Sequence, residues 1–260
     1  FGDIVGQVGR NAVKHNIEKL VKKYQIDFVI ANGENATHGK GLIEKHYNEL
    51  IDAGVDCITL GNHYLSKNMI VNYIDDATAL VRPLNISKRI GGEGSVVFEV
   101  NGVKIRVTNI LGTAFMQEEV ASPYYSLKSL IDSNDGEDSI HIVDFHAEAT
   151  GEKISFAYCF DGLVSAIVGT HTHVQTNDAK ILENGTGFIT DVGMCGAANG
   201  VLGFDRDTVI QKTVFGSTER FDINKDDQEM VNAVIIDVDD MTHKTREIFA
   251  VTLMGEKHNG

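Results

Sequence analysis

Five strand-like runs of this chain end in the same manner, with a glycine or small residue leading into a carboxylate, an amide or an imidazole. In open α/β sheets, ligands bind beyond the carboxyl ends of strands, where loops from several strands meet. We therefore expect these polar side chains to converge on one site of an α/β protein. The five endings are Gly2-Asp3, Gly33-Glu34-Asn35, Gly61-Asn62-His63, Asp144-Phe145-His146 and Gly169-Thr170-His171-Thr172-His173.

Short β-branched runs alternate with helical patterns through much of the chain, and this alternation predicts a layered protein. The segment 42–53 places Leu42, Tyr47 and Leu50 on roughly one face of a helix, which Gly54 would end. Asn101-Gly102 between two apolar runs is a strong signal for a β-hairpin. The expected buried strands are 28–30, 57–60, 140–143 and 166–168, and the expected hairpins join 96–100 to 103–108 and 233–238 to 246–251.

These elements predict an α/β fold with two mixed β-sheets packed face to face and helices on the outside. No segment resembles a linker, and 42% hydrophobic against 23% charged residues can supply a core, so we expect one domain over residues 1–260. Phe1, Gly2 and Asp3 resemble the carboxyl end of a strand, and we expect a few residues to precede Phe1 in the natural protein.

The composition limits which partners the protein is expected to bind and which cellular compartment it is expected to occupy. No apolar run approaches the ~20 residues that span a bilayer, so no membrane association is expected. The cysteines Cys57, Cys159 and Cys195 are far apart and in no paired spacing, which argues against disulfides and favours a reducing cytoplasm. A formal net charge of −14 would repel long nucleic acids, so a phosphate-bearing substrate must find positive charge locally. The subunit number stays open, a homo-oligomer included.

The polar strand endings carry the donor atoms of a metal centre. One Gly-Asp is ordinarily a turn and one His-x-His is ordinarily a coincidence, so the prediction rests on the ordered set. Carboxylate, amide and imidazole donors suit manganese, iron or zinc, and a carboxylate such as Glu34 can bridge two ions ~3.5–4 Å apart. The predicted ligands of two metal ions are Asp3, Glu34, Asn35, Asn62, His146, His171 and His173.

The order of these motifs resembles that of the calcineurin-like metallophosphoesterases. In most of that superfamily the second motif ends in aspartate, whereas here it reads Ala31-Asn32-Gly33-Glu34-Asn35-Ala36. With this variant, the chain is similar to the YmdB-like bacterial branch of the superfamily, over almost its whole length from Gly2 to Met194. Two further stretches carry the likeness, Asp144-Phe145-His146-Ala147-Glu148-Ala149-Thr150 and Gly169-Thr170-His171-Thr172-His173-Val174-Gln175-Thr176.

The resemblance implies a four-layer αββα fold, hydrolysis of phosphodiesters with 2',3'-cyclic nucleotides as the substrate class, and iron as a frequent metal. By position, it also places His63 at the family's catalytic histidine. It assigns one ion to Asp3, Glu34, Asn35 and His173, and the other to Glu34, Asn62, His146 and His171.

Two stretches depart from the family pattern. The family tends to have a tryptophan and an aspartate shortly after His63, where this chain has Tyr64-Leu65-Ser66-Lys67. Cys195-Gly196-Ala197-Ala198 replaces the more usual threonine, glycine and proline. Both departures bear on substrate preference rather than on metal binding.

The expected reaction is the cleavage of a small phosphodiester. Two divalent ions bring four positive charges and the carboxylates of Asp3 and Glu34 bring two negative ones, which leaves a positive centre inside an acidic protein. Phosphoryl oxygens would bind the ions, and a metal-activated hydroxide would attack phosphorus in line with the leaving oxygen. Histidine is suited to protonating a ribose oxygen near neutral pH, and this is the role expected of His63.

Other functions and roles stay open at this point. The motifs also fit a phosphomonoesterase, a nuclease acting on short RNA, or a regulatory protein that binds metal and nucleotide with incidental turnover. Asp144 and Glu148, each two residues from His146, could orient a ligand imidazole or be solvated or capping groups. Arg10 could reach phosphate or form an ordinary surface ion pair.

Overall fold

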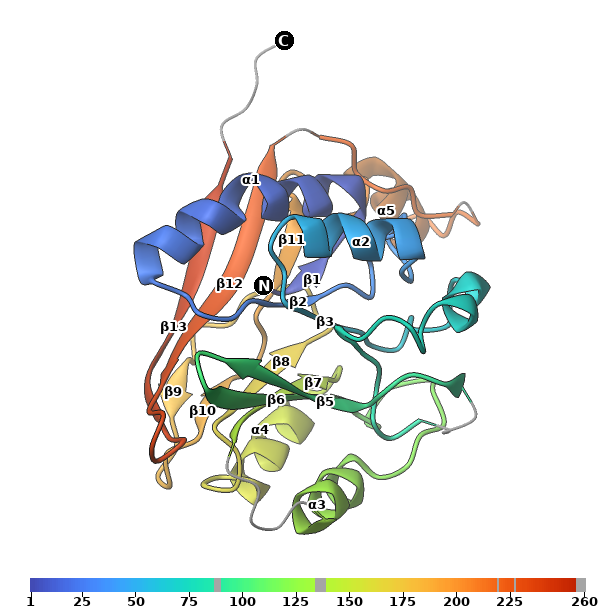
Figure 1. The fold of residues 1–260 in the computed structure, drawn as a ribbon. Helices are drawn as coiled ribbons and strands as arrows, with labels where there is room; N and C mark the ends of the chain where they lie inside the picture. Colours follow the sequence, from blue (N-terminus) through green and yellow to red (C-terminus); the bar gives the residue numbers. More distant parts are fainter. Residues whose placement is uncertain (87–89, 134–138, 219, 227, 256–260) are drawn as a thin grey trace.

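The computed structural model describes residues 1–86, 90–133, 139–218, 220–226 and 228–255 (Figure 1). None of the helices in these ranges is both long enough and apolar enough to cross a membrane. The described helices are α1 (Gly6–Tyr24), α2 (Glu44–Asp52), α3 (Pro123–Ser133), α4 (Thr150–Cys159) and α5 (Arg206–Thr213), together with a short 3₁₀ helix at Asn68–Asn72.

The strands of the described part of the chain form three hydrogen-bonded sheets. The four-stranded sheet, of order β1-β11-β12-β13, consists of β1 (Asp3–Ile4), β11 (Met194–Ala197), β12 (Glu229–Val238) and β13 (Thr245–Met254). The parallel three-stranded sheet, of order β2-β3-β4, consists of β2 (Ile30–Asn32), β3 (Cys57–Thr59) and β4 (Leu80–Val81). The six-stranded sheet, of order β5-β6-β7-β8-β10-β9, consists of β5 (Ser95–Val100), β6 (Val103–Leu111), β7 (Ile140–His146), β8 (Ala166–Thr170), β9 (Lys180–Ile181) and β10 (Gly187–Ile189).

The predicted α/β class is confirmed, but the described residues form three sheets rather than the expected two. The three-stranded and four-stranded sheets lie edge to edge, where the chain entering β1 runs beside β2. The backbone nitrogen of Phe1 donates to Ile30 O at 2.7 Å, and Asn32 N donates to Phe1 O at 3.3 Å. Both bonds are made by Phe1, and they connect the edges of the two sheets.

Helices cover the outer faces of the sheets. α1 packs on β11 and β12, and its apolar side, which includes Val13, Ile17 and Leu20, is buried there. α2 lies beside α1, whereas α3 and α4 lie on the opposite side of the molecule, against the six-stranded sheet (Figure 1). Phe156 of α4 stacks on Phe145 of β7, with ring centroids 4.1 Å apart. The burial of these apolar faces from water is the main term that holds the layers together.

The predicted helix and both predicted hairpins are confirmed, and one predicted strand is displaced. α2 lies within the segment 42–53, and the pairs β5–β6 and β12–β13 are antiparallel. β3, β7 and β8 begin at the expected residues. β2 starts at Ile30 rather than at residue 28, because the Val29 N–H is bound by the Asp56 side chain instead of by a neighbouring strand.

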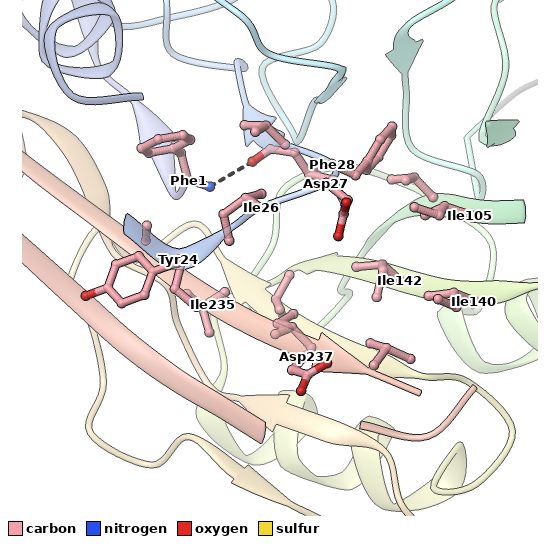
Figure 2. Close-up of a pocket in the computed structure, with 18 of the residues that line it drawn as sticks. Phe1, Tyr24, Ile26, Asp27, Phe28, Ile105, Ile140, Ile142, Ile235 and Asp237 are labelled. Carbon is pink, nitrogen blue, oxygen red and sulfur yellow. Dashed lines mark hydrogen bonds between the residues drawn. The ribbon is translucent and has the colours of Figure 1, made fainter. Parts of the chain in front are cut away.

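Near the start of β7, residues from all three sheets surround a cavity. The cavity is largely apolar, has a volume of about 540 Å³, and is lined by Ile26 and Phe28 from the segment before β2 and by Ile142 of β7 (Figure 2). Asp144 and Thr170 also border this cavity. β7 ends at His146, two residues after Asp144, and β8 ends at Thr170. The predicted site residues His146, His171 and His173 lie at or just after these strand ends.

Candidate metal centre

His146 is the centre of a cluster that contains all the predicted ligands of one metal ion. It is the last residue of β7, and both His146 and Glu34 are almost completely buried. Its Nε2 atom lies 3.3 Å from Glu34 Oε1 and 3.1 Å from Asn62 Oδ1. The same atom lies 3.1 Å from Nδ1 of His171, which follows β8. Donor atoms of Glu34, His146 and His171 lie within 4.8 Å of one another, an arrangement that can hold a metal ion.

Asp3, Asn35 and His173 extend the cluster on the other side of Glu34. Asn35 Nδ2 lies 2.9 Å from Glu34 Oε1 and 3.1 Å from His173 Nε2. Asp3, fully buried in β1, has its Oδ1 3.9 Å from a ring nitrogen of His146 and 3.9 Å from Nε2 of His173. The structure therefore brings the seven predicted ligands into one continuous cluster, and Glu34 contacts both halves of it.

The close approach of the loop after β3 to Glu34 depends on a glycine. A Cβ atom at Gly61 would lie 2.3 Å from Glu34 Oε2 and 2.5 Å from His146 Nε2, so a side chain would collide with the cluster. Two residues later, His63 N donates to Glu34 Oε2 at 2.9 Å. The His63 ring is partly buried, and its Nδ1 lies 3.4 Å from Ser66 Oγ. The predicted catalytic histidine thus borders the cluster.

The loop that carries the two histidines after β8 has a strained backbone. His171 has a φ of 100° and His173 a φ of 65°, values that residues other than glycine rarely adopt. Asp191 supports this loop, because its carboxylate accepts from Thr172 N at 3.1 Å and from Thr172 Oγ1 at 2.8 Å. Lys153 of α4 donates to the same carboxylate at 2.7 Å, and each side chain of this ion pair is 1% exposed. The loop that carries the two histidines is therefore hydrogen-bonded to a buried ion pair.

Burial and charge shift the titration of the cluster. Burial alone would raise the pKa of Glu34, but the charge of His146 and hydrogen bonds from His146 and His63 hold it well below its usual value. Burial opposes the charge on His146, yet the Glu34 carboxylate raises the pKa of His146 to about 9. Burial raises the pKa of Asp3 to about 6, and burial with the charge of His146 lowers the pKa of His171 to about 3. Without a metal ion, these shifts favour a charged Glu34–His146 pair and a neutral His171 imidazole, whose lone pair can bind a metal.

Asp3 provides the clearest sign that the cluster suits a metal. Its Oδ1 atom is buried and accepts no hydrogen bond from the residues that the structure describes, although buried polar atoms are nearly always paired. A cation between this oxygen and Nε2 of His173, which lies 3.9 Å away, would supply the missing partner. Asn35 would take part through Oδ1 after a half-turn of its amide, whose two ends have nearly the same shape. Carboxylate, amide and imidazole donors fit manganese, iron or zinc.

Several contacts to the cluster were missed by sequence reasoning. Glu118 Oε1 accepts from Asn62 Nδ2 at 3.3 Å, and Leu202 O lies 3.0 Å from His173 Nδ1. Both residues lie in loops that no motif marks, and a backbone carbonyl leaves no trace in a sequence. Glu148, for which the sequence leaves two roles open, lies 3.1 Å from His171 Nε2, where a carboxylate orients an imidazole.

Of the two open roles of Arg10, the structure supports the ion pair. Arg10 is buried in α1, and its Nε lies 2.9 Å from Glu49 Oε2. Its Nη1 donates to Ala36 O. The pair differs from the expected one in being mostly buried rather than on the surface. Arg10 therefore links α1 to α2 and to the segment that follows Glu34.

Similarity to known proteins extends over nearly the whole chain. A family model described as YmdB-like protein matches residues 1–251, a range that includes every predicted site residue. A relative from Bacillus subtilis (strain 168), named 2',3'-cyclic-nucleotide 2'-phosphodiesterase, is 43% identical over 258 residues, which cover 99% of this chain and 97% of that protein. A crystal structure of a protein from Mycoplasma pneumoniae, described as a novel phosphatase, is 43% identical with a TM-score of 0.92 and covers 99% of this chain and 92% of its own. A hypothetical protein from Thermus thermophilus is 32% identical with a TM-score of 0.90, and the match covers 98% of each chain.

Proposed function

The chain belongs to the YmdB-like protein family and is a hydrolase of phosphate esters, and from this premise we propose that it is a dinuclear-metal phosphodiesterase acting on 2',3'-cyclic nucleotides. The observation that carries the proposal is the convergence of seven buried or partly buried donor side chains around Glu34. The substrate class is supported by the name of the Bacillus subtilis relative. The acidic chain, with its net charge of −14, favours a small substrate over long RNA.

Two transition-metal ions are proposed, with iron first and manganese or zinc as alternatives. Glu34 would contact both ions, since its Oε1 lies within 3.3 Å of groups on either side. Cysteine is absent from the described cluster, so a thiolate zinc site is not part of the proposal. One ion is assigned to Asp3, Glu34, Asn35 and His173, and the other to Glu34, Asn62, His146 and His171.

In the proposed reaction, side chains of the protein bind the metal ions and transfer a proton to the leaving group. The two ions, when bound, would hold phosphoryl oxygens, lower the pKa of water and neutralise the charge that develops at phosphorus. The His171 ring would bind a metal ion through the lone pair of Nδ1, which faces His146. Its Nε2 would donate a hydrogen bond to the Glu148 carboxylate, which lies 3.1 Å away. His63, beside Glu34 and partly exposed, is assigned to protonate the leaving ribose oxygen.

A phosphomonoesterase is the second candidate. The description of the Mycoplasma pneumoniae structure as a phosphatase favours it, and the same metal centre could serve both reactions. We further propose that residues 1–260 act as one metallophosphoesterase domain, since ligands from Asp3 to His173 meet in one cluster. The layering of helices outside and sheets inside supports the expected four-layer αββα arrangement (Figure 1).

Turnover of a small substrate panel tests the proposed activity. We expect hydrolysis of 2',3'-cyclic nucleotides and of bis-4-nitrophenyl phosphate, and little hydrolysis of 4-nitrophenyl phosphate. The rate on cyclic nucleotides should depend only weakly on salt, because a mononucleotide presents few charges, and long RNA should be a poor substrate. Faster turnover of the monoester would favour the phosphomonoesterase. Efficient cleavage of long RNA that weakens steeply with salt would favour a nuclease.

Metal content tests the proposed centre itself. The metal-replete chain should hold about two ions, as a dinuclear site requires. His171→Ala should lose mainly one of them, because the His171 ring contacts the half of the cluster around His146 and its backbone bond to Asp3 is kept by alanine. Elemental analysis of both proteins gives the comparison, with His15→Ala, an exposed histidine on α1, as the control. One ion or none in the replete unchanged protein would sink the dinuclear proposal.

A further inference from the structure

The side of His146 that faces away from the cluster is held by a chain of hydrogen bonds. Its Nδ1 lies 2.8 Å from Thr170 Oγ1, and Thr170 Oγ1 donates to Asp144 Oδ1 at 2.7 Å. Thr170 stands opposite His146 in the parallel pairing of β7 and β8, so the two side chains are held side by side. All three side chains are at most 3% exposed. These contacts are therefore made in the interior of the protein.

Asp144 fixes the direction of hydrogen bonding along this chain. Its second oxygen accepts from Thr59 Oγ1 and from Asn32 Nδ2, so the carboxylate acts as an acceptor on both oxygens. The Thr170 hydroxyl has one proton, and that proton goes to Asp144. Thr170 Oγ1 must then accept from the Nδ1–H of His146. When Nε2 loses its proton, as binding to a metal ion requires, its lone pair faces the cluster while Nδ1 keeps its hydrogen.

We propose that Asp144, acting through the Thr170 hydroxyl, is a positioning residue that holds His146 in the tautomer and orientation in which Nε2 can bind metal. This inference rests on the proposed metal centre and adds to it the residues that set its affinity. Without the hydroxyl, a buried N–H and a buried carboxylate oxygen would lose their partners, and the ring could change tautomer or rotate. Of the two roles left open for Asp144, orientation of an imidazole is therefore the one that the geometry favours.

Metal affinity of matched threonine variants tests the proposal. Thr170→Val keeps the side-chain shape and removes the hydroxyl, and it should raise the Kd for Zn²⁺ or Mn²⁺ by about 10–100-fold. Thr170→Ser keeps the hydroxyl and should bind nearly as tightly as the unchanged protein. Affinity is measured on metal-free protein by competition with a chromophoric chelator, and circular dichroism checks that each variant is folded.

The control is a second buried threonine–histidine pair in the same sheet. Thr108 Oγ1 of β6 lies 2.8 Å from His141 Nε2, away from the cluster, so Thr108→Val should cost stability without weakening metal binding. Equal weakening by Thr108→Val and Thr170→Val would reduce the role of Thr170 to general stability and overturn the proposal.

Three further outcomes decide the remaining cases. A folded Thr170→Val protein that binds metal as tightly as the unchanged protein overturns the proposal while leaving the metal centre intact. If Thr170→Val does not fold, Asp144→Asn makes the same test, because it keeps the side-chain size and removes an acceptor; unchanged affinity there would count equally against it. An unchanged protein that binds no metal contradicts the proposed function first, and this inference with it.

Discussion

Replacing His63 with alanine is expected to lower kcat on 2',3'-cyclic nucleotides by about 10²–10⁴-fold, the usual contribution of a general acid. Metal content should remain close to that of the unchanged protein. The reason is that alanine keeps the backbone N–H that donates to Glu34 Oε2, so the contact between this loop and the cluster survives. Steady-state kinetics and elemental analysis on the same samples give both quantities.

The choice of leaving group separates proton donation from substrate orientation at His63. A nitrophenyl diester has an acidic leaving group that needs little protonation, so His63→Ala should recover relatively more rate on it than on a cyclic nucleotide. Asn62→Ala serves as the neighbouring control, because its loss should lower metal occupancy and be partly repaired by added metal. Equal impairment of His63→Ala on both substrates, with metal retained, would remove the general-acid assignment.

Replacing Lys153 with methionine is expected to lower the free energy of unfolding by about 3–5 kcal/mol, the cost of leaving one partner of a buried ion pair unpaired. For a chain of this size, that loss corresponds to a fall in Tm of roughly 6–20 °C. Methionine fills nearly the same space but carries no charge, so Asp191 would lose its buried cationic partner. Thermal unfolding in the absence of added metal measures the effect.

Two controls identify the source of this loss. Lys22→Met removes an ion pair whose side chains are 73% and 77% exposed, and should leave the free energy of unfolding nearly unchanged. The double variant Lys153→Met with Asp191→Asn should recover part of the stability, because no charge is then left buried. If Lys153→Met costs no more than Lys22→Met, the buried pair does not support the fold.

The position of the site could be predicted because it follows from local rules. Strand ends recognisable from β-branched runs carry Glu34 and His146, and the carboxyl ends of neighbouring strands meet in space. Asp3 instead begins β1, although the sequence predicted the end of a strand there. The hairpin at Asn101-Gly102 was predictable for a similar reason, since its turn is specified by two adjacent residues.

The number of sheets and the supports of the site could not be predicted in the same way. Whether β1 and β2 form one ladder depends on how many backbone bonds join them, which a pattern of apolar residues does not specify. The pairing of Lys153 with Asp191 joins residues far apart in the chain, and neither stands in a motif that suggests a buried charge. Glu118 and Leu202 reach the cluster through loop conformation alone.

The buried contacts of Asp144 have a consequence for how this scaffold tolerates change. Through Asn32, Thr59 and Thr170, this one carboxylate ties the ends of β2 and β3 to those of β7 and β8. In a random mutagenesis library, we expect few substitutions to be accepted at Asp144 and its three partners. There are two separate reasons, because these residues join the sheets and also orient His146. The loops that carry Glu118 and Leu202 are under neither constraint. We therefore expect those loops to accept more substitutions than the strand ends do.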